Sequence, residues 1–287
     1  MSTRKLTSII ESMATSDGAG VKLRRSLGST PHARLDPFLM LDEFYSDNPD
    51  DYIAGFPPHP HRGFETVTYM LDGRMEHKDH LGNTGDLGPG SVQWMTAGRG
   101  VIHSEMPKQT EGRMRGFQLW LNLPAAEKMR SADYRDIPAT DITGLDFDGG
   151  SARVIAGTLT IDQQSVAGPV NSPDQPLSTD PLYVDLRLEA GTEVDVPVPV
   201  GHNVFVYLYD GEAIIGERKL PRQSAGVLTD GDRVVLRAGA EGTGLLLLAG
   251  RPIGEPVAQY GPFVMNTREE IEQAIADYRS GRLAAGA

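Results

Sequence analysis

Residues 57–73, PPHPHRGFETVTYMLDG, place two histidines, His59 and His61, directly before a run that is typical of a β-strand. Residues 66–70 are mostly β-branched or aromatic, and Asp72-Gly73 is typical of a tight hairpin turn. Side chains two residues apart in a strand point to the same face of a sheet. The segment therefore predicts a β-rich fold in which the two imidazoles lie side by side.

A second pair with the same spacing, His103 and Glu105, follows further along the chain. Together the two pairs offer three imidazoles and one carboxylate, which can hold a divalent transition metal and leave coordination positions open. Glu65 is an alternative carboxylate ligand, because it lies in the strand that follows His61. We favour Glu105, because its spacing from His103 mirrors the first pair. Glu65 is then expected behind the ligands, or in a salt bridge with Arg62.

Other side chains near these pairs receive weaker interpretations. His77 and His80 are three residues apart, which suits a helix face better than a strand, so we expect both to be solvated. His32 is interpreted as structural. Gln118, in a predicted strand at 117–121, could orient a ligand. Four apolar residues are candidates for the walls of the site, with only some facing inward: Phe64, Trp94, Met95 and Phe117.

Composition excludes several classes of function. There is no cysteine, so disulfides, thiolate metal sites and cysteine nucleophiles are excluded. The formal net charge of −12 opposes direct binding to nucleic acid or an anionic membrane. No apolar run is long enough to span a bilayer, and the apolar stretch after Lys5 ends at Glu11, too soon for a signal peptide. We expect a cytoplasmic protein. The acidic run 42–51 is interpreted as a solvated loop, with a lid as the alternative.

The second half of the chain repeats the first in weaker form. Tyr69-Met70-Leu71-Asp72-Gly73 aligns with Tyr207-Leu208-Tyr209-Asp210-Gly211, which indicates two copies of one β-barrel module. The alignment places prolines, Pro197 and Pro199, opposite the first histidine pair, so the second copy lacks ligands. We predict an N-terminal metal-binding domain at 1–140 and a degenerate domain at 150–287. The latter ends in a helix that begins at a Thr267/Glu270 capping box and carries an apolar stripe of Ile271, Ala274, Ile275 and Tyr278.

Longer motifs connect these features to a known family. They are PPHPHRGFET at 57–66, QWMTAGRG at 93–100, HSEM at 103–106, QLWLNLP at 118–124, GRP at 250–252 and QYGPFVMNT at 259–267. The sequence resembles the pirin family, bicupins of the cupin superfamily, over nearly its whole length. The resemblance implies an all-β fold of two tandem cupin (jelly-roll) barrels facing each other, followed by the helix. It also implies one metal, normally iron, in the N-terminal barrel, with His59, His61, His103 and Glu105 as ligands.

The resemblance implies two functions. Some family members have quercetin 2,3-dioxygenase activity, and others are described as transcriptional co-regulators that respond to the redox state of iron. We expect an Fe(II) dioxygenase that acts on a flavonol such as quercetin with O₂, in which Glu105 accepts the proton of a substrate hydroxyl. Nickel, manganese, copper, cobalt and zinc also suit these ligands. The alternatives are a redox-responsive co-regulator that acts through a protein partner, and a metal-binding storage protein without a specific reaction.

Overall fold

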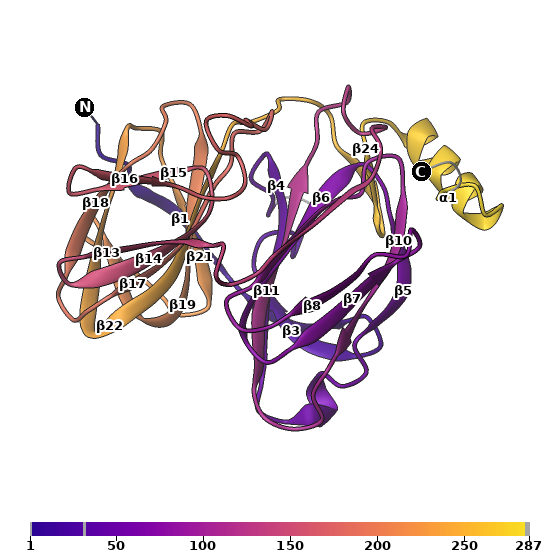
Figure 1. Cartoon of the computed structure of the whole chain (residues 1–287). Coiled ribbons are helices and arrows are strands. Elements are labelled where there is room, and N and C mark those ends of the chain that lie inside the picture. The colour runs from indigo at the N-terminus through magenta and orange to yellow at the C-terminus, as the bar shows by residue number, and fades with distance from the viewer. Residues whose placement is uncertain (1, 31–32, 285–287) are drawn as a thin grey trace. The chain divides into compact units, whose positions relative to one another are not determined.

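The computed structural model describes residues 2–30 and 33–284, so His32 lies outside the described residues. The chain forms two compact units, and each unit is assembled from three separate segments. The first, here called the histidine unit, comprises Ala14–Arg25, Phe38–Ala139 and Ile253–Ala287. The second, here called the aliphatic unit, comprises Met1–Met13, Ser26–Pro37 and Thr140–Pro252. β-Strands dominate both units, as predicted (Figure 1).

The two units do not follow the contiguous boundaries expected from the sequence. The N-terminal residues 1–13 belong to the aliphatic unit, and the C-terminal residues 253–287 belong to the histidine unit. The first strand, β1 (Leu6–Glu11), pairs with β21 (Ser224–Leu228), so the indigo ribbon runs among orange strands in Figure 1. The C-terminal helix α1 (Arg268–Arg279) packs on Phe263 and Met265 in the histidine unit. Two ordinary requirements explain these placements. The backbone N–H and C=O groups of β1 need hydrogen-bond partners, which β21 supplies. The apolar face of α1 needs to be buried, and Phe263 and Met265 cover it.

The described residues of the histidine unit form two main sheets and a two-stranded sheet of β23 and β24. The larger has the strand order β12-β9-β6-β11-β4-β3-β2, and the smaller has the order β5-β10-β7-β8. The strands of this unit are β2 (Met13–Asp17), β3 (Val21–Arg25), β4 (Phe38–Ser46), β5 (Phe56–His61), β6 (Phe64–Asp72), β7 (Met75–Asp79), β8 (Thr84–Leu87), β9 (Val92–Thr96), β10 (Val101–Pro107), β11 (Met114–Asn122), β12 (Asp133–Ile137), β23 (Ala258–Tyr260) and β24 (Phe263–Met265). One end of the space between the sheets is filled by an apolar cluster that includes Phe44, Met70 and Met114.

The Asp72-Gly73 turn is real, but the prediction of a hairpin there is wrong. Gly73 has a φ of +85°, which suits glycine, yet β6 lies in the larger sheet and β7 in the smaller one. The turn is therefore a corner at which the chain passes between sheets. A hairpin follows one strand later, where β7 pairs with β8.

The acidic run 42–51 is only partly a solvated loop, which corrects the prediction. Asp42 and Glu43 are buried inside β4. Arg25 donates two hydrogen bonds to Asp42, at 2.8 and 2.7 Å, and Arg115 donates two to Glu43, at 3.1 and 2.9 Å. These paired cations compensate for the loss of hydration that otherwise keeps carboxylates at the surface. The run ends in a short 3-10 helix, η1 (Pro49–Asp51).

The main core cluster of the aliphatic unit is aliphatic, although the unit also buries Asp185 and Tyr209, whose hydroxyl donates a hydrogen bond to Asp185. Its sheet has the order β1-β21-β19-β22-β17-β14-β13, and its core cluster consists of aliphatic residues such as Val184, Val206 and Leu247. The remaining strands of this unit are β13 (Thr143–Phe147), β14 (Gly150–Ala156), β15 (Thr158–Ile161), β16 (Gln164–Ala167), β17 (Leu182–Leu188), β18 (Glu193–Pro197), β19 (Asn203–Ile215), β20 (Arg218–Leu220) and β22 (Arg233–Gly250). Among the described residues of this unit, no three histidine or acidic side chains lie at a spacing that could hold a metal ion.

Helix α1 begins as predicted. The Thr267 hydroxyl accepts from the Glu270 amide and the Glu270 carboxylate accepts from the Thr267 amide, which completes the capping box. Ile271 and Ala274 are buried, whereas Tyr278 is largely exposed, so the apolar stripe is narrower than expected. Within residues 2–30 and 33–284, no helix is long and apolar enough to cross a membrane.

Candidate metal centre

Strand pairing in the smaller sheet brings three histidines together. His103 on β10 lies opposite His59 on β5, and His61 follows two residues along the same strand. Their ring centroids are 4.3 Å apart for His59 and His103, 4.7 Å for His59 and His61, and 4.8 Å for His61 and His103. One nitrogen from each ring lies within 4.8 Å of the others. The predicted same-face geometry of the first pair is thus present, and the third imidazole joins it.

The nitrogens of this trio fit a metal ion better than a hydrogen-bond network. His61 Nδ1 and His103 Nε2 are buried and have no hydrogen-bond partner among the described residues. His59 Nδ1 lies 2.9 Å from the Pro57 carbonyl oxygen and can donate a hydrogen bond to it. In a neutral ring, Nε2 is then unprotonated and has a free lone pair. Buried polar atoms rarely stay unpaired without a ligand or a functional reason. His59 is half-buried, so the trio is open on one side.

The protonation state of the buried rings also favours metal binding. Burial, followed by the proximity of other imidazoles, holds the pKa of His61 and of His103 well below the usual range of histidine. Both rings are therefore neutral near pH 7. Neutral imidazole is the form that donates a lone pair to a metal.

Glu105 lies beside the trio but in a separate group of candidate ligands. A carboxylate oxygen of Glu105 lies within 4.8 Å of a ring nitrogen of His77 and of a ring nitrogen of His103. The set of ring nitrogens from His59, His61 and His103 that meets the same distance does not include Glu105. The Thr68 hydroxyl on β6 lies 2.9 Å from Glu105 Oε1 and 2.6 Å from Gln118 Oε1. A hydroxyl has one proton, so a bond donated to a Glu105 carboxylate requires Gln118 to turn its amide group towards Thr68. Burial raises the pKa of Glu105.

His77 corrects the sequence interpretation, because it is fully buried rather than solvated. It lies opposite Glu105 in the pairing of β7 with β10, and its Nε2 is 2.6 Å from His103 Nδ1. Burial lowers the pKa of His77 to about 3, so this ring is neutral as well. The prediction failed because it considered the spacing of His77 and His80 along the chain, whereas the pairing of β7 with β10 decides the contact. His80 is exposed, as predicted.

Glu65 lies on the other face of β6 from Thr68, because three residues separate them in a regular strand. It is buried and accepts a hydrogen bond of 2.7 Å from Thr96, and burial raises its pKa to about 7. The suggested salt bridge with Arg62 is absent from the described contacts. Arg62 instead donates to Asp277 on α1, at 2.8 Å.

Side chains alternate between the two faces of a strand, and this alternation shows which of the four candidate wall residues lie on the face of Thr68. Met95 pairs with Thr66, so it shares the face of Thr68, and Phe64 lies two residues before Thr66 on that face. Trp94 and Phe117 pair with Val67 and Tyr69, so they lie on the opposite face. Trp120, which the sequence interpretation missed, pairs with Thr66 on the inner face, and its ring is 5.3 Å from that of His61.

The C-terminal segment supports the strand that carries the first two histidines. Next to His61, the Arg62 carbonyl accepts from the Val264 amide at 3.0 Å. Gly63 has a φ of +89°, and a Cβ there would lie 2.0 Å from the Val264 carbonyl oxygen. Buried Lys128 donates to the carbonyls of Gly63 and Val264, at 2.7 and 3.1 Å, and to the Asn122 side chain. These contacts require glycine at position 63 and fix the backbone directly after the ligand pair.

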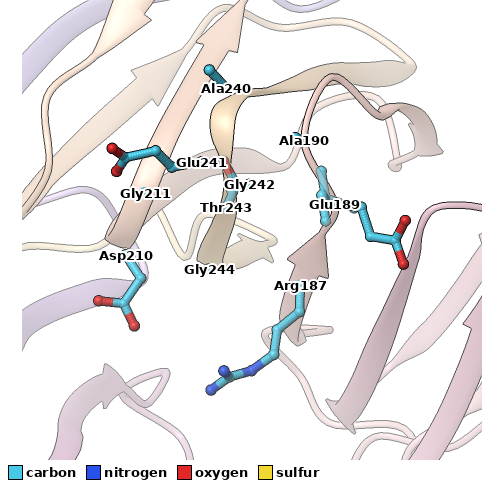
Figure 2. A pocket seen from close by; sticks show the side chains of 11 residues that line it. Arg187, Glu189, Ala190, Asp210, Gly211, Ala240, Glu241, Gly242, Thr243 and Gly244 are labelled. Atoms are coloured by element: carbon cyan, nitrogen blue, oxygen red, sulfur yellow. The ribbon is translucent and has the colours of Figure 1, made fainter.

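The described residues of the aliphatic unit contain no comparable cluster of histidine and acidic side chains. A depression of about 500 Å³ lies at the end of strand β17 and beside the irregular middle parts of β19 and β22 (Figure 2). Charged side chains, including Arg187, Glu189 and Asp210, line it together with several glycines, and Figure 2 shows them spread around the rim. This lining contains no histidine, which leaves the trio as the candidate functional site.

Comparison with known proteins agrees with this fold and identifies the family. The Pirin family model matches residues 20–121, and the Pirin C-terminal cupin domain matches residues 183–284. A Pseudomonas aeruginosa protein named "Putative quercetin 2,3-dioxygenase" is 55% identical over 94% of both chains. Human Pirin is 41% identical over 98% of this chain and 94% of its own. A crystal structure of quercetin 2,3-dioxygenase from Acinetobacter baumannii is 33% identical, covers 98% of this chain and 99% of its own, and has a TM-score of 0.87. With both cupin domains matched in order and relatives aligned over nearly its whole length, the chain belongs to the pirin family.

Proposed function

We propose that this protein is a metal-dependent dioxygenase that acts on a flavonol such as quercetin, with O₂ as co-substrate. The observation that carries the proposal is the open histidine trio, with its buried and unpaired ring nitrogens. The names of the Pseudomonas and Acinetobacter relatives support the choice of reaction.

His59, His61, His103 and Glu105 would hold the ion. Nitrogen and carboxylate donors without thiolate suit ferrous iron, and they also suit nickel, manganese, copper, cobalt and zinc. A bound divalent ion would supply a Lewis acid to the hydroxyl of an enolic substrate. Glu105 has three side-chain torsions, so rotation can bring its Oε2 towards the trio while Thr68 continues to contact Oε1.

The protein groups around the trio have distinct tasks. Glu105 would accept the proton of the substrate hydroxyl as its carboxylate loosens from the ion. Thr68 orients that carboxylate, and Gln118 orients Thr68. Phe64, Met95 and Trp120 place apolar surface on the inner face of the larger sheet, where an aromatic ring can exclude water.

The proposal is tested by O₂ consumption with quercetin, after anaerobic reconstitution of the protein with Fe(II). We expect uptake that requires both iron and His59, so that His59→Ala abolishes it. His80→Asn is the matched control, because His80 is exposed and outside the trio. No uptake by protein that holds stoichiometric iron would contradict the dioxygenase and favour the co-regulator that acts through a protein partner.

A further inference from the structure

His77 is a buried histidine that the proposed reaction does not use. It projects from β7 opposite Glu105, and it is fully shielded from solvent. Its Nε2 lies 2.6 Å from His103 Nδ1, and the two ring centroids are 4.5 Å apart. The Glu105 Oε1 atom is 3.9 Å from the same His77 nitrogen, too far for a hydrogen bond. His103 is therefore the hydrogen-bond partner of His77 Nε2.

Two ring nitrogens at this distance must share a proton, since two lone pairs would repel each other. The proton belongs either to His103 Nδ1 or to His77 Nε2. If His77 donated it, neutral His103 would carry its own proton on Nε2, and that nitrogen could not bind a metal. If His103 donates it, Nε2 keeps its lone pair. Each arrangement leaves one N–H and one lone pair without a partner among the described residues, at His103 Nε2 and at His77 Nδ1. Only the second arrangement gives the lone pair to the nitrogen of His103, which belongs to the trio, so that an ion bound there would satisfy it.

We propose that His77 is a positioning residue that accepts the Nδ1 proton of His103 and so presents His103 Nε2 to the metal. The inference rests on the proposed metal site but not on the flavonol reaction. A metal-bound histidine commonly donates its other ring N–H to a carboxylate or a carbonyl, and here a second imidazole takes that role. The contact also excludes His77 itself as a ligand through Nε2, because that atom is occupied by the shared proton.

The first test determines the tautomer of His103 in the full-length wild-type chain. Two-bond ¹H–¹⁵N correlation spectra of the metal-free and Zn(II)-loaded protein distinguish protonation at Nδ1 from protonation at Nε2. We expect His103 to be protonated at Nδ1 and His77 to be protonated at Nδ1 in both samples. A proton on His103 Nε2 in both samples would overturn the proposal, and this measurement needs no variant to fold.

The second test compares Fe(II) affinity among variants, by anaerobic competition with a chelator. His77→Phe keeps an aromatic ring but removes the acceptor, and we expect binding about 10- to 100-fold weaker. His77→Gln restores an acceptor oxygen and should stay close to wild type, as should the His80→Asn control. Loss of binding in both His77 variants would identify His77 as a ligand, and unchanged binding in His77→Phe would show that the contact has no positioning role. Neither readout uses O₂ or quercetin, so a failed dioxygenase assay leaves this test intact.

Discussion

At the scale of single residues, the candidate site combines two kinds of neighbour: side chains two residues apart along one strand, and side chains opposite each other on paired strands. The pairs His59/His61 and His103/Glu105 are visible because residues two apart in a strand share a face. His77 was misplaced because its burial depends on pairing with a strand that lies well beyond it in the chain. The relation between Thr68 and Gln118 depends on the same kind of register, which a sequence pattern without an alignment does not specify.

Glu65 provides a prediction about pH and stability. Its pKa is about 7 in the folded protein because it is buried, against a usual value near 4.5. Between about pH 4.5 and 7 the folded state therefore binds more protons than the unfolded state, so this residue lowers stability as pH rises. Glu65→Gln should remove that slope, which is worth at most about 3 kcal/mol across the interval.

The measurement is urea unfolding of wild type and Glu65→Gln at pH 5 and pH 7.5. Other buried groups, such as Asp42, contribute slopes of their own, so only the difference between the two proteins is informative. We expect the variant to gain stability relative to wild type at the higher pH. A difference that is the same at both pH values would show that Glu65 titrates normally.

At the scale of elements, strand existence was easier to predict than strand partnership. Residues 64–72 form a strand as their composition indicates, but the Asp72-Gly73 turn joins two sheets instead of two paired strands. The amide of Arg74, just after the turn, bonds to the Gln109 side chain, a contact that the local sequence does not reveal. Helix α1 was predicted well, because capping and an apolar stripe are local signals.

The contact between α1 and the ligand strand gives a prediction at this scale. Asp277→Asn removes the charged partner of buried Arg62, and we expect a loss of about 1–3 kcal/mol in the free energy of unfolding. Glu272→Gln on the same helix breaks an exposed pair with Arg268 and should cost less than about 1 kcal/mol. Urea denaturation measures both. Equal effects of the two substitutions would refute a supporting role for the Arg62–Asp277 pair.

At the scale of the whole molecule, internal similarity predicted two β modules correctly but not the assignment of the chain ends. The repeat detects strands that resemble each other, and terminal segments have no counterpart in it. Residues 253–284 pack in the histidine unit through Val264. Its side chain packs with Phe64, and its carbonyl oxygen accepts a hydrogen bond from Lys128. A boundary placed in the loop-rich residues near 140–150 cannot reveal that the two terminal segments exchange units, with residues 1–13 in the aliphatic unit and residues 253–287 in the histidine unit.

A fragment experiment tests this exchange. A chain that ends at Pro252 lacks Val264 and the Arg62–Asp277 pair, so we expect it not to bind Fe(II) stoichiometrically. Addition of a peptide of residues 253–287 should restore binding, whereas a peptide with Val264→Asp should not, since a buried carboxylate would replace an apolar contact. Full metal binding by the fragment alone would show that the histidine unit does not need its C-terminal segment.

The exchange of ends also orders events during translation. Proteins generally fold as their domains emerge from the ribosome, with the N-terminal domain first. Here the strand that carries His59 and His61 is made before its support at Val264 and Asp277, which lies about 200 residues further along the chain. The nascent chain would thus carry its ligands through the synthesis of the intervening residues without the backbone contacts that fix them. Metal acquisition would then wait until this later segment has been made and has packed on the ligand strand.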